Sequence, residues 1–194
     1  MLKTITMMYE TGKNFSSKNY KPEQIEHGDY EDCMFMGINF SGYNFSDYRF
    51  SSCDFKDCDL SNVKIHKAAL REIVFKNCKL IGINFEDAHP FNLSFRFEDC
   101  ILNHSSFYKL DIRKTVFKNC SLNEVDFTET DLSNSVFQGC DLTSAVFDRT
   151  ILESSDFRNA SNFSINPNHN QLKKAKFSRN NLAGLLSGFQ ITIE

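Results

Sequence analysis

Large apolar residues recur at every fifth position over most of the chain, with small or polar residues between them. From Tyr30 the large residue returns every five positions as far as Phe85, and the same period runs from Phe97 to Phe157. A helix repeats its apolar face about every 3.6 residues and a strand about every 2, so a period of five fits neither. The pattern therefore indicates a repeat protein built from one short unit.

A second inward position lies two residues before each large residue and usually holds a small side chain. All seven cysteines fall at this position, and none forms a Cys-x-x-Cys pair. Their odd number also argues against a framework of disulfides. Because free cysteine packs as a small hydrophobe, we interpret these residues as part of the core. They are Cys33, Cys53, Cys58, Cys78, Cys100, Cys120 and Cys140.

Several of the five-residue units share one form. Residues 53–57, 58–62 and 140–144 read Cys-Asp-Phe-Lys-Asp, Cys-Asp-Leu-Ser-Asn and Cys-Asp-Leu-Thr-Ser. They resemble the A(D/N)LXX unit of the pentapeptide-repeat family, and the resemblance extends over about residues 28–160. It implies a mainly β fold, a right-handed quadrilateral parallel β-helix in which each unit forms one of four faces. Each coil of such a solenoid contacts only its neighbours.

Coils of four units sort the large residues into four columns, provided that His89-Pro90 marks an insertion of two residues. Two opposed columns are then rich in phenylalanine and the other two in leucine, an alternation that fills a narrow interior. The same alignment stacks the cysteines from Cys58 to Cys140 in one ladder. One column is predicted to contain Phe35, Phe55, Phe75, Phe97, Phe117, Phe137 and Phe157.

The repeat pattern divides the chain into three parts. Residues 1–27 continue the period only weakly, and we interpret them as an N-terminal lead-in or cap. Residues 28–180 form the predicted β-helix, with an interruption near 88–92, and residues 181–194 follow as a C-terminal element. Caps are expected because an open hydrophobic end of a solenoid invites aggregation.

The C-terminal element predicts a short helix and then a strand. Asn180-Asn181 precede a helical pattern of leucines, and residues 189–194 alternate like a half-buried strand. Two arrangements are open: the segment folds back as a hydrophobic plug, or it pairs with its copy across a two-fold axis. Resemblance to topoisomerase-protecting members of the family favours a homodimer. The dimerisation residues would be Leu182, Leu185, Leu186, Phe189, Ile191 and Ile193.

The sequence contains no constellation typical of an enzyme. The five histidines lack the spacing of metal ligands. Aspartates that precede a large residue are explained by hydrogen bonds to nearby backbone groups at the corners. We therefore expect no catalytic residue, no metal and no cofactor. No apolar run reaches the ~20 residues of a membrane span and no signal peptide is evident, so a cytoplasmic protein with reduced cysteines is expected.

Acidic residues gather in the later repeats. Residues 121–157 hold eight acids against Arg149 as their single base, although the net charge of the whole chain is only −3. These acids either keep a hydrophobic solenoid soluble or present a partner with the field of a DNA duplex. The predicted acidic face consists of Glu124, Asp126, Glu129, Asp131, Asp141, Asp148, Glu153 and Asp156.

Function must reside on the outer surface, because the repeat describes the interior. Resemblance to the quinolone-resistance group of the family, the Qnr and MfpA type, implies a non-enzymatic protein that binds a type II topoisomerase. DNA gyrase or topoisomerase IV would then be the partner, bound by mimicry of DNA without direct nucleic-acid contact. The alternative is a scaffold that docks an unrelated protein. Two inserted residues are too few for the longer loops of Qnr-type members, although MfpA-like members lack these loops.

Overall fold

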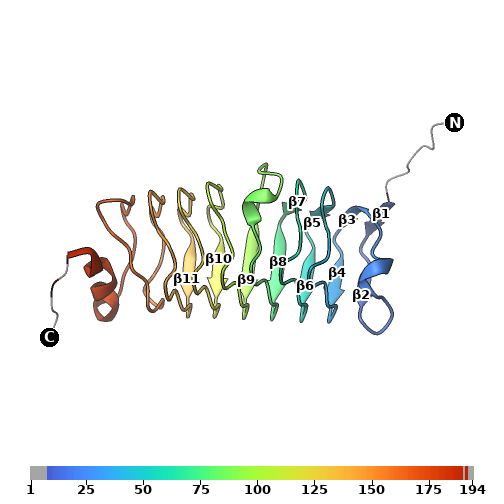
Figure 1. The fold of residues 1–194 in the computed structure, drawn as a ribbon, viewed down its shortest axis with the longest axis horizontal. Coiled ribbons are helices and arrows are strands. Elements are labelled where there is room, and N and C mark those ends of the chain that lie inside the picture. The colour runs from blue at the N-terminus through green and yellow to red at the C-terminus, as the bar shows by residue number, and fades with distance from the viewer. Residues whose placement is uncertain (1–7, 190, 192–194) are drawn as a thin grey trace.

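The computed structural model describes residues 8–189 and residue 191, and shows a rod of stacked coils (Figure 1). Short strands alternate with turns along the described chain, and four stretches form 3₁₀ helices. The helices are η1 (Pro22–Gln24), η2 (Phe85–Asp87), η3 (Arg179–Leu185) and η4 (Ser187–Phe189). The strands are β1 (Met8–Thr11), β2 (Asn14–Ser16), β3 (Gly28–Glu31), β4 (Met34–Met36), β5 (Arg49–Ser51), β6 (Asp54–Lys56), β7 (Ala69–Arg71), β8 (Ile73–Lys76), β9 (Phe95–Glu98), β10 (Val116–Lys118) and β11 (Val136–Gln138).

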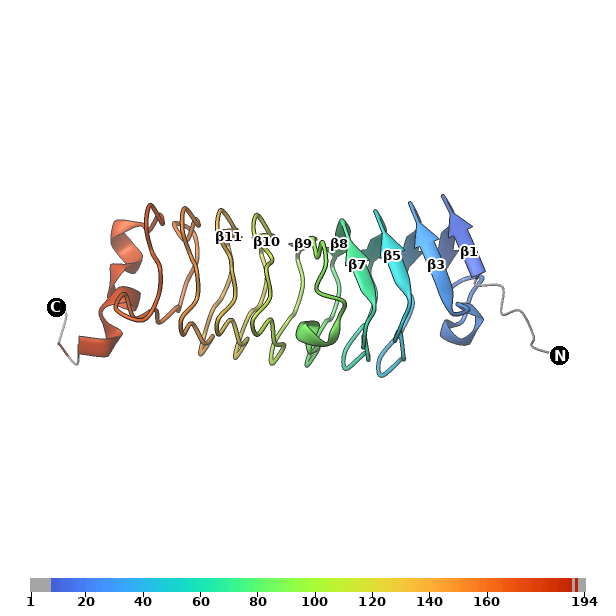
Figure 2. The same cartoon turned by 90° about the horizontal axis from the view of Figure 1, so that it is seen from above.

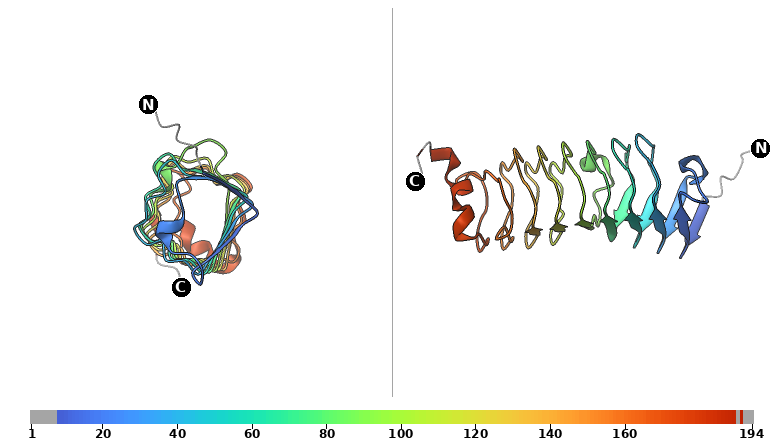
Figure 3. Two further views of the ribbon diagram at one scale, coloured as in Figure 1. Left: turned by 90° about the vertical axis from the view of Figure 1, so that its right-hand side faces the viewer. Right: turned by 90° about the horizontal axis from the view of Figure 1, so that it is seen from below.

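The strands form two parallel sheets on two faces of the rod (Figure 2). One sheet has seven strands in the order β11-β10-β9-β8-β6-β4-β2, and the other has four in the order β1-β3-β5-β7. The other two faces are joined by isolated parallel bridges, such as Asn39 with Asp59 and Asp126 with Val146. Viewed along the axis, the coils enclose a four-sided tube (Figure 3). The predicted parallel β-helix is confirmed.

We number the faces 1 to 4 in chain order, so that face 1 carries the seven-stranded sheet and face 4 the four-stranded sheet. Partner residues in neighbouring coils lie twenty positions apart, as in the pair Phe117 and Phe137. Between one pair of neighbouring coils, the partner residues are instead 22 positions apart, as in the pair Phe75 and Phe97. The two additional residues belong to the segment between η2 and β9, which projects from the rod in Figure 1.

Phenylalanine rings stack along face 1 as the sequence predicts. Neighbouring rings in this column are 4.5 to 5.4 Å apart between centroids and nearly parallel. The column extends one coil beyond the prediction at each end, to Phe15 and Phe177. At the N-terminus, β1 and β2 pair with β3 and β4, so the coils begin before residue 28. Phe15, Tyr20 and Ile25 keep the five-residue period in this early coil, but the positions two residues before them hold the charged side chains of Lys13, Lys18 and Glu23.

The cysteine ladder lies in the core, and its thiols act as hydrogen-bond donors. All seven cysteines are buried and free. The Cys78 thiol donates to the Phe55 carbonyl at 3.3 Å, and the Cys100 thiol donates to the Phe75 carbonyl at 3.4 Å. Ser105 makes the same bond from its hydroxyl to a carbonyl of the preceding coil. Cysteine and serine at this position thus add a hydrogen bond that the sequence pattern did not indicate, whereas Ala68 and Val125 fill it without a side-chain donor.

The C-terminal helices cover the end of the rod. The Ser178 N–H donates to the Asn181 side chain at 3.0 Å, so η3 begins slightly before the predicted Asn180-Asn181 cap. Gly184 lies so close to the solenoid that a Cβ atom there would be 2.6 Å from the Phe163 ring. The predicted strand over 189–194 does not begin at Phe189, which ends η4, and residues 190 and 192–194 lie outside the described residues.

Candidate functional site

The eight candidate acids surround the rod instead of gathering on one face. Parallel bridges place Asp156 on face 1, Asp141 on face 2, Asp126 on face 3 and Asp131 on face 4. The remaining four follow large residues of faces 2, 3 and 4 in the same two coils. We call this set the acidic belt. Its members are Glu124, Asp126, Glu129, Asp131, Asp141, Asp148, Glu153 and Asp156.

Half of the acidic belt is paired with arginine or lysine. A count along residues 121–157 missed three of these bases, because Lys109 and Arg113 lie one coil away and Arg158 lies just beyond residue 157. The Arg149 guanidinium beside Glu129 holds the pKa of that carboxyl below its ordinary value. The pairs are Glu129 with Arg149 (2.9 Å) and Lys109 (3.6 Å), Asp131 with Arg113 (3.7 Å), Asp148 with Arg149 (2.7 Å) and Asp156 with Arg158 (2.7 Å).

Four belt acids have no arginine or lysine partner among the ion pairs of the described residues. These are Glu124, Asp126, Asp141 and Glu153, and Glu124 lies 3.3 Å from the His104 ring nitrogen. The side chains of Asp126 and Asp141 accept backbone N–H groups two residues ahead, at 2.8 and 3.1 Å. This agrees with the interpretation of the aspartates as turn residues. The uncompensated charge is greatest around faces 2 and 3.

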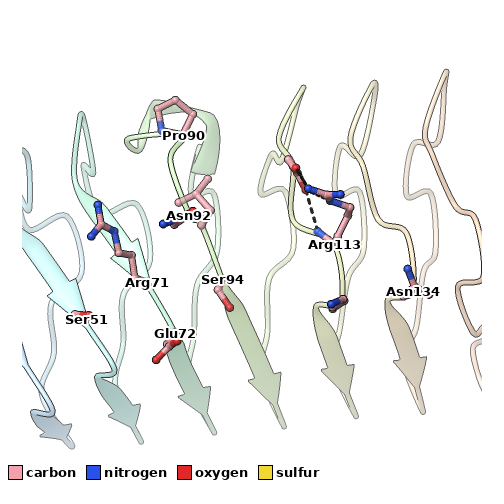
Figure 4. Close-up of a pocket in the computed structure, with 11 residues that line it drawn as sticks. Ser51, Arg71, Glu72, Pro90, Asn92, Ser94, Arg113 and Asn134 are labelled. Atoms are coloured by element: carbon pink, nitrogen blue, oxygen red, sulfur yellow. Dashed lines mark hydrogen bonds and ion pairs between the residues drawn. The ribbon is translucent and has the colours of Figure 1, made fainter.

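A polar groove on face 4 was not predicted from the sequence (Figure 4). Its volume is about 610 Å³, and it extends across several coils beside the projecting segment. Arg71, Arg113 and Lys114 provide positive charge in the groove, and Glu72 and Asp111 provide negative charge. One signal in the sequence could have revealed this groove. The insertion of two residues lies between two units that carry basic residues, and these units are about two coils apart.

A bulge at residues 90–92 creates the groove. The His89 N–H still donates to the Ala68 carbonyl at 2.9 Å, and the Ser94 N–H reaches the Leu70 carbonyl at 3.4 Å. The accepting residues Ala68 and Leu70 are only two residues apart in the preceding coil, whereas the donors His89 and Ser94 are five residues apart. The additional residues are therefore forced outward, and no strand of the four-stranded sheet follows β7 within the described residues.

The bases of the groove differ in how strongly they are engaged. Arg113 is held by Asp111 through two hydrogen bonds of 2.8 and 2.7 Å. The Arg71 guanidinium instead lies 5.7 Å from the centroid of the Phe91 ring, and Phe91 is 60% exposed. Arg71 and Lys114 take part in no ion pair among the described residues. Two cationic side chains therefore remain available at the groove.

The C-terminal helices present an apolar outer surface. Leu185 packs against the core, so the segment covers the end of the solenoid as a plug. Ile193 lies outside the described residues. The other four dimerisation candidates are exposed, at 43% for Leu182, 36% for Leu186, 54% for Phe189 and 57% for Ile191. The inner side of the segment thus closes the rod, and its outer side exposes apolar side chains.

The described residues contain no group of three or more His, Cys, Asp or Glu side chains placed to hold a metal ion. In the same part of the chain, no helix is long and apolar enough to cross a membrane. The space enclosed by the coils is filled by stacked aromatic and aliphatic side chains. The outer surfaces are therefore the candidates for function.

Comparison with known proteins supports the fold. A family model described as the pentapeptide repeat region matches residues 28–107 and 111–186. No curated protein matches the chain significantly. Trypsin-treated QnrB1, a plasmid-mediated fluoroquinolone resistance protein, superposes with a TM-score of 0.64 at 16% identity, covering 97% of this chain and 98% of that chain. Full-length QnrB1 superposes with a TM-score of 0.51 at 18% identity, covering 95% and 99%.

Proposed function

Since the chain belongs to the pentapeptide-repeat family, we propose that it is a non-catalytic module that binds a partner protein through the outside of a rigid rod. The packed interior supports this proposal, because residues such as Phe97 and Phe117 are fully buried and occupy the space that a ligand would need. Ligand sites normally require a cleft or cavity of about 300–1,000 Å³. Binding must then occur on the surface.

The proposed partner is a type II topoisomerase, DNA gyrase or topoisomerase IV, bound at the surface that normally receives DNA. The acidic belt is the observation that carries this proposal, because a duplex presents negative charge around its whole circumference. Clustered like charges produce a field that attracts a basic groove and accelerates association. QnrB1, which shares the fold, is a fluoroquinolone resistance protein, and this function agrees with a topoisomerase partner.

A homodimer through the C-terminal helices would enlarge the acidic surface. The exposed apolar residues of η3 and η4 form a patch at the end of the rod, next to the coils that carry the acidic belt. A two-fold axis at this end would bring the two belts toward the centre of a longer rod. Such a dimer would present more duplex-like charge than one chain.

A DNA supercoiling assay with purified gyrase and a fluoroquinolone tests the proposal. We expect the protein to preserve supercoiling in the presence of the drug. The variant Glu124→Gln/Asp126→Asn/Glu153→Gln should lose this effect, because it removes three belt charges that have no Arg or Lys partner. The asparagine introduced in place of Asp126 retains a side-chain oxygen that can accept the turn hydrogen bond. The matched control is Asp32→Asn/Asp47→Asn/Asp54→Asn, at the opposite end of the rod.

Two outcomes would contradict a topoisomerase partner. One is the absence of both protection and inhibition by the wild-type protein at micromolar concentration. The other is equal loss of effect in the belt variant and in the control variant, which would show that total charge alone matters. The second candidate, a scaffold for an unrelated partner, is favoured by the polar groove on face 4, where Arg71 and Lys114 have the opposite charge to the belt.

A further inference from the structure

We propose that the groove on face 4 binds an extended acidic peptide segment of a partner protein. This site adjoins the acidic belt at Arg113, which also pairs with Asp131, and it does not depend on a topoisomerase partner. The proposal combines three features of the groove: open backbone hydrogen-bonding groups, two cationic side chains without carboxylate partners, and an exposed aromatic ring.

Some backbone groups beside the groove have no hydrogen-bond partner among the described residues of the neighbouring coil. They belong to one rung of face 4, by which we mean the backbone of one coil on that face. In the following coil, the Asp131 N–H donates to the Leu110 carbonyl at 2.8 Å, and the Asp131 carbonyl accepts from the Ile112 N–H at 3.0 Å. The equivalent groups of Asp111 point toward residues 88–94. No backbone hydrogen bond joins those residues to the rung at Asp111 in the described chain. The bulge has thus left one donor and one acceptor free beside the groove.

A donor and an acceptor on the same rung match the groups of an extended peptide. Peptides commonly bind by adding main-chain hydrogen bonds to an open sheet edge, and their side chains then provide specificity. A small anion would use the Asp111 N–H but would be repelled by the carbonyl beside it. The phosphate backbone of a nucleic acid has no donor for this carbonyl, whereas an extended peptide supplies both a donor and an acceptor.

The side chains around the open rung favour acidic residues in that peptide. Arg71 lies in the coil before the bulge (Figure 4), Lys114 lies in the coil after it, and both line the groove. Alternate residues of an extended segment point the same way, so its carboxylates can reach both bases. Phe91, which already contacts Arg71, offers an apolar surface to an intervening side chain.

Fluorescence anisotropy with labelled eight-residue peptides tests this proposal on the full-length protein. We expect a peptide of alternating Glu and Thr to bind, and a Lys-Thr peptide of equal length not to bind. The variant Arg71→Gln/Lys114→Gln should weaken binding about fivefold or more, as the loss of two partly exposed charge pairs predicts. The matched control Lys56→Gln/Lys118→Gln removes two bases from face 1 and should bind normally.

Backbone N-methylation of the Glu-Thr peptide tests the hydrogen bonds to the open rung, and it should abolish binding. The proposal is overturned if the N-methylated peptide binds equally well, if the groove variant binds like the control variant, or if an oligothymidylate of the same length binds more tightly than the peptide. Thermal melts of both variants show whether they are folded. A chain that fails the supercoiling assay can still bind this peptide, so the two proposals fail separately.

Discussion

Replacing Phe117 with alanine would remove one ring from the middle of the face 1 column. Phe117 is fully buried, and its ring centroid lies 5.1 Å from that of Phe97 and 5.0 Å from that of Phe137. It also makes edge contacts with Phe107 and Phe127, the rings of the opposed column. The cavity would therefore open at the centre of the solenoid, where both neighbouring coils are held in place by their own stacking.

The expected cost is large for a single side chain. Replacement of a buried Phe by Ala typically costs about 3–5 kcal/mol, and an aromatic pair adds about 0.5–1.5 kcal/mol beyond its area. Because Phe117 has two stacked partners, we expect Phe117→Ala to lower the free energy of unfolding by an amount near the upper limit, about 5 kcal/mol. Phe117→Leu keeps most of the apolar volume but loses both stacking contacts, and it should cost about 1–2 kcal/mol.

Equilibrium urea denaturation followed by circular dichroism measures both losses. Phe91→Ala is the control, because this ring is largely exposed and its removal should change stability by less than about 0.5 kcal/mol. The reasoning is refuted if Phe117→Ala costs less than about 2 kcal/mol, or if the Leu and Ala variants are equally unstable. A small loss in Phe117→Ala would mean that the coils relax into the cavity. Equal losses in the Leu and Ala variants would mean that ring stacking contributes more than packing volume.

Two further predictions concern the C-terminal surface and the acidic belt. Leu186→Asp/Phe189→Asp should convert a dimer into a monomer in sedimentation velocity while Phe91→Asp leaves the dimer intact, and a wild-type monomer would contradict the homodimer. The folded-state pKa of Glu129 is depressed by Arg149, so its stabilisation is present above the unfolded pKa of about 4.3 and is lost as pH falls through the lower folded value. Urea denaturation between about pH 5 and pH 3 should show a shallower loss of stability in Arg149→Gln than in the wild type, and identical slopes would contradict this role.

The sequence predicted the interior well because two independent patterns had to agree. An insertion of two residues near His89 aligns both the phenylalanine column and the cysteine ladder, and the pairing of Phe75 with Phe97 confirms it. Phe15 and Phe177 keep the five-residue period of the sequence, and the structure places both rings at the ends of the column.

The outer surface was harder to predict because it depends on neighbours one coil away. Lys109 precedes Glu129 by twenty residues, so a coil of twenty places them side by side, yet a charge count along the chain separates them. The groove was hidden for another reason. The net insertion of two combines a bulge after His89 with a shortened connection from Ser94 to Phe97, and only the sum of these changes is visible in the spacing.

The open rung beside Asp111 also bears on how the rod unfolds. In a solenoid, each coil is held by its two neighbours, and stability is approximately a sum of coil and interface contributions. Between the coil that carries the bulge and the next coil, face 4 contributes no backbone hydrogen bond in the described residues, whereas the other three faces remain joined. We therefore expect the two coils to separate more easily at this junction than at one joined on all four faces, such as the junction between the coils of Phe117 and Phe137.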